Sequence, residues 1–477
     1  MIYIVVKLSV WIESSRNRYR KSRSVIIVLM NKQTGLITGT TLLFISSVVI
    51  FLGRLATSVV IARTLGPEFK GIYSLTLLSS GMVIIISNLG LNGAITYFAA
   101  SQKFTGKQLF LLSLVGGIIL SIIGSVLFFL AYNIFFIHNI LADVNPTLIL
   151  WVMLALPMSL VTSFLSSLLL GQQRMVSFNL VNITNILTNL GFQILSSLLN
   201  GGLSGAIIAW IAASGVELLL ALWYVRHDIN LRFRELNDIL TPTLSYGGRS
   251  YISNLLQFFN YRLDSYLVNF FSGAAAVGQY TTSVSVAELL WYLPNAVSGA
   301  LFPKVSSVYK GTANRLTPQA CRQTVLLVFI GALIFSLVGG WVIVWFYGEA
   351  FRPAIVPFLW LLPGMIGLSI AKIVSADLSG RGKPQYSAYT AGVTVVLTVI
   401  LDVLLIPTYN IRGAAIASSI SYITSGSLSV FLFFHETGIT PQILLIPRLS
   451  DIRLLIKRGM VLLQNIKRYA LSRKGIY

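Results

Sequence analysis

The sequence predicts an all-α membrane protein with about twelve transmembrane helices, arranged as two parallel six-helix lobes around a central cavity. The 477-residue chain is 55% hydrophobic and only 10% charged, and its mean hydropathy is +0.81. Long apolar runs recur along it, and several short motifs return about half a chain later. A soluble multidomain protein of this length would carry far more charge.

Each long apolar run is interpreted as a helix, because crossing a bilayer takes about 20 apolar residues and lipid tolerates no unpaired backbone. The first six runs are 36–62, 72–100, 109–137, 147–170, 176–199 and 203–225. The second six are 251–271, 277–303, 324–347, 354–378, 386–406 and 411–434. We therefore expect a basic cytoplasmic N-terminal extension (1–35), an N-terminal lobe (36–225), a cytoplasmic linker (226–250), a C-terminal lobe (251–435) and a basic tail (436–477).

The basic residues predict the orientation of the chain. Lys and Arg number 35 against 14 Asp and Glu, a net charge of +21, and most of them lie in short stretches on the side that both termini share. Such stretches stay in the cytoplasm, so both termini are expected there. No basic domain stands apart from the spans, which argues against nucleic-acid binding. Translation starts either at Met1 or at Met30, just before the first run.

The termini and the cysteine content narrow the chemistry further. The tail mixes Leu and Ile with basic residues, which favours an amphipathic helix on the anionic inner leaflet, although a partly ordered solvated tail is an alternative. The single Cys321 excludes an internal disulfide and a cysteine metal site. The three histidines lie at predicted span ends. We expect no cofactor, no metal and no catalytic residue.

A short turn occurs twice. The pattern Gly, four residues, Gly, any residue, Tyr begins at Gly66 and again at Gly273, 207 positions later. Two further matches keep nearly the same offset: Gly205 with Gly413 at 208, and Gly171 and Arg174 with Gly380 and Lys383 at 209. Because six spans are an even number, both halves cross the membrane in the same sense. The glycines are expected to supply φ > 0 at turns and to let helices approach closely.

Residues 62–74, Ala-Arg-Thr-Leu-Gly-Pro-Glu-Phe-Lys-Gly-Ile-Tyr-Ser, resemble the opening of the polysaccharide-biosynthesis (O-antigen and exopolysaccharide) flippases. These belong to a superfamily that also holds the multidrug and toxic compound extrusion antiporters and the peptidoglycan lipid flippases. The Gly-Arg-Gly-Lys-Pro turn at 380–384 is similar too, and the resemblance covers Met30 to about Glu436.

The resemblance implies a flippase and not an enzyme. Its substrate would be an undecaprenyl-pyrophosphate-linked oligosaccharide, moved by alternating access across a bacterial or archaeal cytoplasmic membrane for a surface lipopolysaccharide or exopolysaccharide. The implied partners are that lipid-linked oligosaccharide, membrane lipids, and the polymerase and glycosyltransferases of the same pathway.

Two arginines lie within predicted spans at matching positions, Arg54 and Arg262, 208 residues apart. A charge there costs about 2.5–3.5 kcal/mol on insertion scales, so it usually faces a cavity or a partner. Two guanidinium groups facing one cavity would suit a pyrophosphate, and Arg249 near the inner mouth could receive the head group first. The alternative is that each arginine pairs with an acid or a carbonyl of a neighbouring helix and only holds the lobes together.

Acidic residues within spans raise the question of ion coupling. Asp264 and Glu288 lie in adjacent spans, and Glu217, Asp377 and Asp402 are spread over others. A carboxylate in a dry cavity could couple transport to protons or sodium. The simpler interpretation pairs one acid with Arg262, and Glu288 is the better partner, because residues i and i+2 of a helix point apart. Lys70 and Arg63 are expected at outer turns.

Two other functions fit the sequence less well than a flippase does. A drug or metabolite antiporter would favour an acidic cavity, whereas the first span carries Arg54 and no acid. A membrane glycosyltransferase or polymerase needs catalytic groups in sizeable outer loops. The outer turns are short, and the longest, near 138–146, holds only Asp143.

Overall fold

The computed structural model describes residues 36–134, 137–229, 236–307 and 310–449, together with Asp451 and Arg453. Every regular element in these residues is a helix, as predicted. The expected extension 1–35 and most of the expected tail lie outside the described residues, and so does the choice between Met1 and Met30.

The first repeat, residues 36–225, consists of seven helices in the described residues, and a short 3₁₀ turn follows them. These elements are α3 (Leu36–Ser87), α4 (Leu91–Ala100), α5 (Gly106–Ile134), α6 (Ile137–Ile140), α7 (Pro146–Gly171), α8 (Met175–Leu198), α9 (Gly202–Val225) and η1 (Arg226–Asp228).

The second repeat, residues 251–435, follows the same plan. Its elements, with the helix that follows it, are α10 (Leu236–Ala287), η3 (Glu288–Trp291), α11 (Tyr292–Ser307), α12 (Lys310–Tyr347), η4 (Glu349–Ala354), α13 (Ile355–Gly380), α14 (Gln385–Tyr409), α15 (Ile411–Thr437) and α16 (Pro441–Leu445). Helix α10 thus begins inside the segment 226–250 that the sequence predicts to be a connection.

Eight helices of the described residues are long and apolar enough to cross a membrane. One of them, Val48–Ser87, contains the Gly66 turn and therefore covers parts of the first two predicted spans. Predicted spans five, seven and eight also fall on helices, α8, α10 and α11, but are not among the eight. The protein is a multi-pass membrane protein, and its count of twelve spans stays a prediction.

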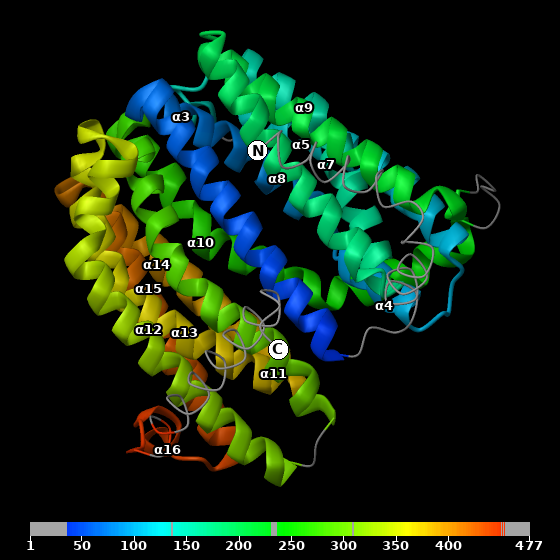
Figure 1. Ribbon diagram of the computed structural model, residues 1–477, viewed down its shortest axis with the longest axis vertical. Helices are drawn as coiled ribbons and strands as arrows, with labels where there is room; N and C mark the ends of the chain where they lie inside the picture. Colours follow the sequence, from blue (N-terminus) through cyan, green and yellow to red (C-terminus); the bar gives the residue numbers. More distant parts are fainter. Residues whose placement is uncertain are drawn as a thin grey trace, which may run out of the picture.

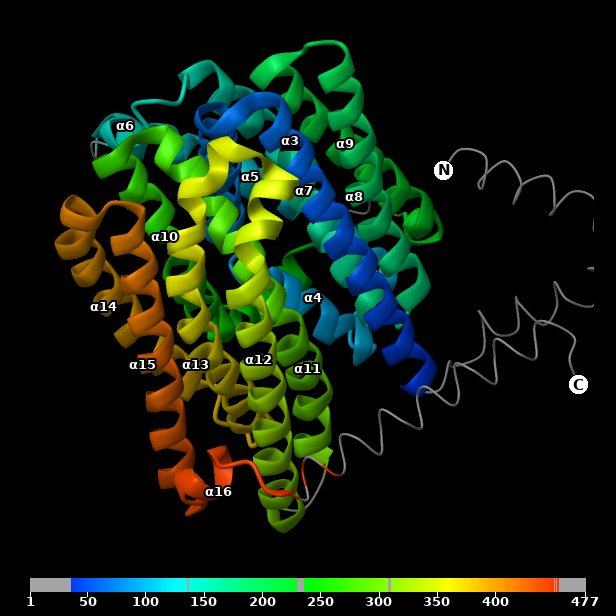
Figure 2. The ribbon, with the colours of Figure 1, turned by 60° about the vertical axis from the view of Figure 1, so that its left-hand side comes forward.

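The helices form two groups joined by two long elements. Figure 1 shows α5, α7, α8 and α9 on one side and α12 to α15 on the other, with α3 and α10 between them. Helix α3 packs directly on α10, so the repeats meet through these two helices. Figure 2 shows α6 and α16 at opposite ends of the molecule.

The paired turns explain why the repeated motif needs its glycines. Gly66 has φ 74° and ψ −179°, and Gly273 has φ 80° and ψ 173°, so both occupy backbone that only glycine adopts without strain. The second glycines of the motif touch the other turn reciprocally: a Cβ on Gly71 would overlap the carbonyl of Ala274, and one on Gly278 that of Pro67. The predicted roles of these glycines are confirmed. We call this region the turn end.

Two predicted spans are interrupted. The run 72–100 breaks after α3, where Leu89 and Gly90 have φ of 49° and 75°. The break brings the backbone of Gly90 against that of Gly247 in α10. The run 277–303 is broken by η3, which begins at Glu288. Hydropathy gave no sign of either break, because the sequence stays apolar on both sides.

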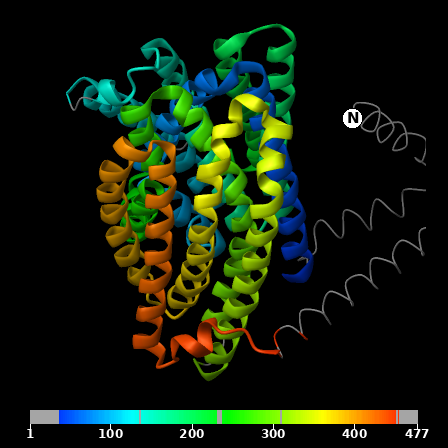
Figure 3. The same cartoon turned by 90° about the vertical axis from the view of Figure 1, so that its left-hand side faces the viewer.

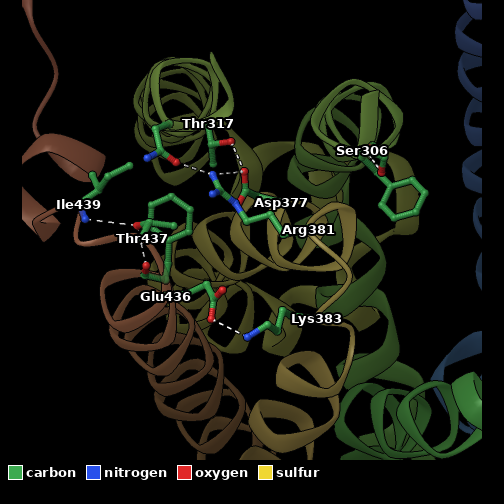
Figure 4. Close-up of polar contacts among 11 residues, drawn as sticks. Ser306, Thr317, Asp377, Arg381, Lys383, Glu436, Thr437 and Ile439 are labelled. Atoms are coloured by element: carbon green, nitrogen blue, oxygen red, sulfur yellow. Dashed lines mark hydrogen bonds and ion pairs between the residues drawn. The ribbon is translucent and has the colours of Figure 1, made fainter. Parts of the chain in front are cut away.

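At the end opposite the turn end, polar contacts fasten the helices of each repeat. Arg174 donates a hydrogen bond to the carbonyl of Tyr224 at 2.7 Å. Its counterpart Lys383 pairs with Glu436, with Nζ and Oε2 3.0 Å apart (Figure 4). The matched basic residues therefore both reach the last helix of their own repeat.

Asp377 links α13 to α12 at this same end. It accepts hydrogen bonds from Thr317 and Arg381, each at 2.5 Å (Figure 4).

The segment after α15 turns back across the lower end of α12, as Figure 3 shows. Arg322 of α12 holds it there, because Nε and Nη2 donate to the Asp451 carboxylate at 2.6 and 3.2 Å. Both side chains are buried. A third donation, from Nη1 to the Ile443 carbonyl at 2.5 Å, completes the contact.

Candidate functional site

Polar contacts close the interface between the repeats at the turn end. Arg63 donates to the carbonyl of Phe346 at 2.7 Å and also to that of Trp345, at the end of α12. The amide of Ala274, just after the second turn, donates to Asp143 Oδ2 at 3.0 Å. These contacts join first-repeat to second-repeat residues, so any motion that separates the repeats here must break them.

Arg54 lines a cavity of about 300 Å³ between the repeats. The walls include Asn185 and Asn189 from the first repeat and Thr281 from the second. Arg54 forms no hydrogen bond or ion pair with the described residues, although Glu217 lies within electrostatic range. A guanidinium that is unpaired and faces a cavity is available to bind an anion.

Lys70 lines the same cavity, which the sequence did not predict. It lies in the turn motif that begins at Gly66, but it is buried there, with only 4% of it exposed. Its Nζ donates to Thr282 Oγ1 and lies 4.8 Å from the ring centroid of Tyr347. The burial comes from α10 and α12, which are remote in sequence. One signal was present, since the matching position of the second turn holds Val277.

Arg262 forms an ion pair with Glu288. Nη1 lies 3.0 Å from Oε1, and Nη2 donates to Oε2 at 3.5 Å. This is the pairing that helix geometry favoured over Asp264. Glu288 is the first residue of η3, so the interruption after α10 holds the acid at this position. The charge of Arg262 is therefore partly balanced, unlike that of Arg54.

The two arginines lie in neighbouring parts of the interface, but Arg262 is not among the residues that line the Arg54 cavity. The ring of Phe51, one turn before Arg54, lies 4.7 Å from that of Tyr292. Tyr292 in turn lies within electrostatic range of both Arg54 and Glu288. Arg249 belongs to α10, and its side chain is outside the described part of the chain.

Asp264 and Asp402 form a buried acidic pair in the second repeat. Asp264 Oδ2 accepts hydrogen bonds from Tyr280 at 2.5 Å and from Ser418 at 3.2 Å. Asp402 is fully buried, neither of its oxygens has a hydrogen-bond partner among the described residues, and it lies within electrostatic range of Asp264. Arg262 also lies within electrostatic range of Asp264. Two buried carboxylates within electrostatic range of each other repel when both are charged, and a bound cation relieves that repulsion.

Sequence reasoning noted Asp402 but did not pair it with Asp264. The two lie 138 positions apart, on α14 and α10, and only tertiary packing brings them together. Within the described residues, no group of three or more His, Cys, Asp and Glu side chains could hold a metal ion.

The fold and the interface define a helical membrane transporter built from two repeats, with ionisable side chains where the repeats meet. The chain belongs to the polysaccharide biosynthesis protein family, whose model matches residues 36–309.

Relatives and a solved structure agree with this assignment. The chain is 25% identical over 372 residues to a probable low-salt glycan biosynthesis flippase of Haloferax volcanii. The aligned residues cover 76% of this chain and 75% of the relative. It is 24% identical to a putative O-antigen transporter of Shigella flexneri, over 59% of this chain and 68% of the relative. The structure of the lipid II flippase MurJ in an inward closed conformation superposes with a TM-score of 0.66 at 14% identity, covering 88% of this chain and 92% of that one.

Proposed function

We propose that this protein is a flippase that translocates a lipid-linked oligosaccharide across a membrane for polysaccharide biosynthesis. The observation that carries the proposal is the cavity between the repeats, where Arg54 and Lys70 form no ion pair with a described residue. A transporter that moves an anionic lipid head group needs such positive charge. Family membership and relatives named as flippases support the same function. The protein is a transporter and not an enzyme.

The finer assignments rest on the sequence and on the fold. The membrane is the cytoplasmic membrane of a bacterium or an archaeon, and the basic loops keep both termini in the cytoplasm. The two repeats act as lobes that alternately open to either side, with the turn end facing outward. The polymerase and glycosyltransferases of the same pathway supply and consume the glycan.

Arg54 binds the pyrophosphate of the substrate, with Lys70 as a second cation in the same cavity. Arginine suits this role because its planar fork binds phosphate oxygens in pairs. Arg262 contributes from the other repeat when its pair with Glu288 opens. Arg249 would receive the head group first, near the inner mouth.

Asp264 couples transport to a proton or a sodium ion, with Asp402 as its partner. The buried acidic pair supports this role, because uptake or release of a cation changes its charge and so the stability of the surrounding packing. Glu288 serves instead to balance Arg262.

Complementation of a strain that lacks its own flippase tests the proposal. Arg54→Ala is expected to abolish surface polysaccharide while the protein remains in the membrane, and Arg262→Ala is expected to do the same. Arg412→Ala is the matched control, because Arg412 is exposed at the start of α15. Normal export by both the Arg54 and the Arg262 variants would contradict the assigned roles.

A further inference from the structure

A second cavity, of about 750 Å³, lies inside the second repeat. Its walls come mainly from α10, α13 and α14, with Phe302 from α11 and Ser425 from α15, and we call it the second-repeat cavity. Among the described residues, four side-chain amides line it, together with several serine and threonine hydroxyls and no Asp or Glu; the amides are Asn254, Gln257, Asn260 and Gln385. Its volume falls within the range of small-molecule sites, about 300–1,000 Å³.

Part of the polar lining is specific to the second repeat, whereas Asn254, Ser375 and Ser425 have the polar counterparts Ser46, Ser166 and Glu217 in the first. At the repeat offsets of 208 and 209, four of its polar positions have apolar counterparts in the first repeat: Gln257 with Val49, Asn260 with Leu52, Gln385 with Val176, and Ser387 with Phe178. The first repeat packs the same helices without these polar groups. The fold therefore does not require them, and a ligand is the better explanation for their presence.

Lys372 gives the cavity a single cation. Its Nζ lies 4.8 Å from the ring centroid of Trp291 and 5.5 Å from that of Tyr261. It forms no ion pair with a described residue, although Glu288, which pairs with Arg262, lies within electrostatic range. Its counterpart at offset 209 is the neutral Ser163. Aromatic rings stabilise a cation without neutralising it, so the charge stays available to an oxyanion.

We propose that the second-repeat cavity binds a sugar unit that carries an oxyanion, either the carboxylate of an acidic sugar or a phosphate attached to a sugar. The inference rests on the proposed flippase function and names the part of the glycan that this repeat selects. Amides both donate and accept hydrogen bonds, so they match sugar hydroxyls and acetamido groups in either direction. Tyr261 and Phe302 add aromatic surface to the same walls.

Other ligands fit this cavity less well. A lipid tail would cover the amides of Asn254, Gln257 and Gln385 without offering them hydrogen-bond partners. A cationic drug would meet Lys372 and find no acid on the walls. An oxyanion on a sugar satisfies both the amides and the lysine.

Binding to the purified full-length protein in detergent micelles tests the proposal by thermophoresis. The probes are trigalacturonate (an acidic glycan), chitotriose (a neutral acetamido glycan) and inorganic pyrophosphate. The wild type is expected to bind both glycans, and to bind one of the two anionic probes in a Lys372-dependent manner. If the binding of trigalacturonate depends on Lys372, the oxyanion belongs to an acidic sugar. If the binding of pyrophosphate depends on Lys372, the oxyanion belongs to a phosphate. Lys372→Met should weaken that anionic probe about tenfold, a change of about 1.4 kcal/mol, and leave chitotriose unchanged.

The repeat itself supplies the decisive variant. Gln257→Val combined with Ser387→Phe installs the first-repeat residues and should weaken chitotriose binding at least tenfold, by about 1.4 kcal/mol or more. Thr424→Val is the matched control, because Thr424 is exposed on α15 and bonds to the carbonyl of Ile420 in its own helix. A melting temperature equal to that of the wild type shows that the double variant is folded. If it melts lower, Asn254→Leu alone replaces it, with the same expected loss.

Unchanged glycan binding by these folded variants, or no glycan binding by the wild type, would overturn the subsite. The flippase function fails separately, when the wild type does not translocate a lipid-linked oligosaccharide in vesicles even though it binds the probes. If the wild type translocates the substrate and the double variant translocates it equally well, only the subsite is overturned.

Discussion

The two repeats share a backbone plan but differ in charge at matched positions. In the first repeat, Gln193 donates to Tyr73 at 3.4 Å and to the carbonyl of Ala206 at 2.8 Å, so the buried network is neutral. In the second repeat, the matching tyrosine, Tyr280, donates to Asp264, and Asp402 occupies the position of Gln193.

This difference separates what the fold needs from what function needs. The first repeat shows that α3, α8 and α9 pack without a buried acid at these positions, since the counterpart of Asp264 is Ala56. Burying carboxylates costs free energy, so the acidic pair lowers the stability of the fold. A role in transport would explain why the pair is present. The cations are not divided the same way, because Arg54 and Arg262 match and Lys372 of the second repeat has the neutral counterpart Ser163. Lys70 belongs to the first repeat, and Val277 stands at its place in the second.

Making the second repeat resemble the first should have the largest effect. Asp402→Gln and Asp264→Ala install the first-repeat residues, and each is expected to lower the rate of ion-driven translocation in proteoliposomes at least tenfold, about 1.4 kcal/mol in the barrier. The physical reason is that the site no longer holds a cation. The melting temperature of Asp402→Gln should stay equal or rise, because the change removes a buried acid that has no hydrogen-bond partner among the described residues.

The control for that exchange is Arg412→Ala, because Arg412 is exposed at the start of α15 and lies outside the acidic pair. It should leave ion dependence intact. Ion-driven translocation at the wild-type rate in both acid variants would contradict the proposed role of Asp264 and Asp402 in ion coupling. The charge difference between the repeats would then have no role in transport.

The turn end is where the repeats are most alike, so matched substitutions there should have matched effects. Gly71→Ala and Gly278→Ala each push a Cβ into the backbone of the other turn. We expect each to lower stability by about 1–3 kcal/mol, and by similar amounts, as measured by thermal melting. Gly299→Ala is the control, because a Cβ there meets no atom within 4 Å. A large loss from one turn and none from the other would show that the contact is not reciprocal.

The smallest effect concerns Arg322 and Asp451, a contact that follows the second repeat. Hydrogen bonds from Arg322 hold the pKa of the Asp451 carboxyl below its usual value. The stabilisation is therefore present above the unfolded pKa, about 3.9, and is lost as pH falls through the lower folded pKa. Asp451→Asn should cost about 1–2 kcal/mol at pH 7 and progressively less in acid.

Melting curves between pH 7 and pH 3 check this prediction. The wild type and Asp451→Asn should differ most at neutral pH and converge at the acid end. A difference that stays constant over the whole range would show that the carboxylate charge is not what fastens this segment.

The sequence predicted the features that depend on local spacing. Positive φ at Gly66 and Gly273 follows from the turn pattern, and the pairing of Arg262 with Glu288 follows from helix periodicity. The charge pattern and the apolar runs predicted an all-helical membrane protein.

The remaining features depend on packing between distant segments. The burial of Lys70 is created by α10 and α12, and the approach of Asp402 to Asp264 by the contact of α14 with α10. The second-repeat cavity joins four helices whose polar residues are scattered along the chain. Its signal becomes readable only when the two repeats are aligned and compared position by position.

The most direct test of the account is translocation by the purified protein. It would be reconstituted in vesicles with a fluorescent undecaprenyl-pyrophosphate-linked oligosaccharide on one leaflet, and transfer would be followed by the access of a soluble glycosidase on the other side. The account predicts transfer above that of protein-free vesicles, lost in Arg54→Ala and retained in Arg412→Ala. Folded wild-type protein that gives no transfer above protein-free vesicles would contradict it.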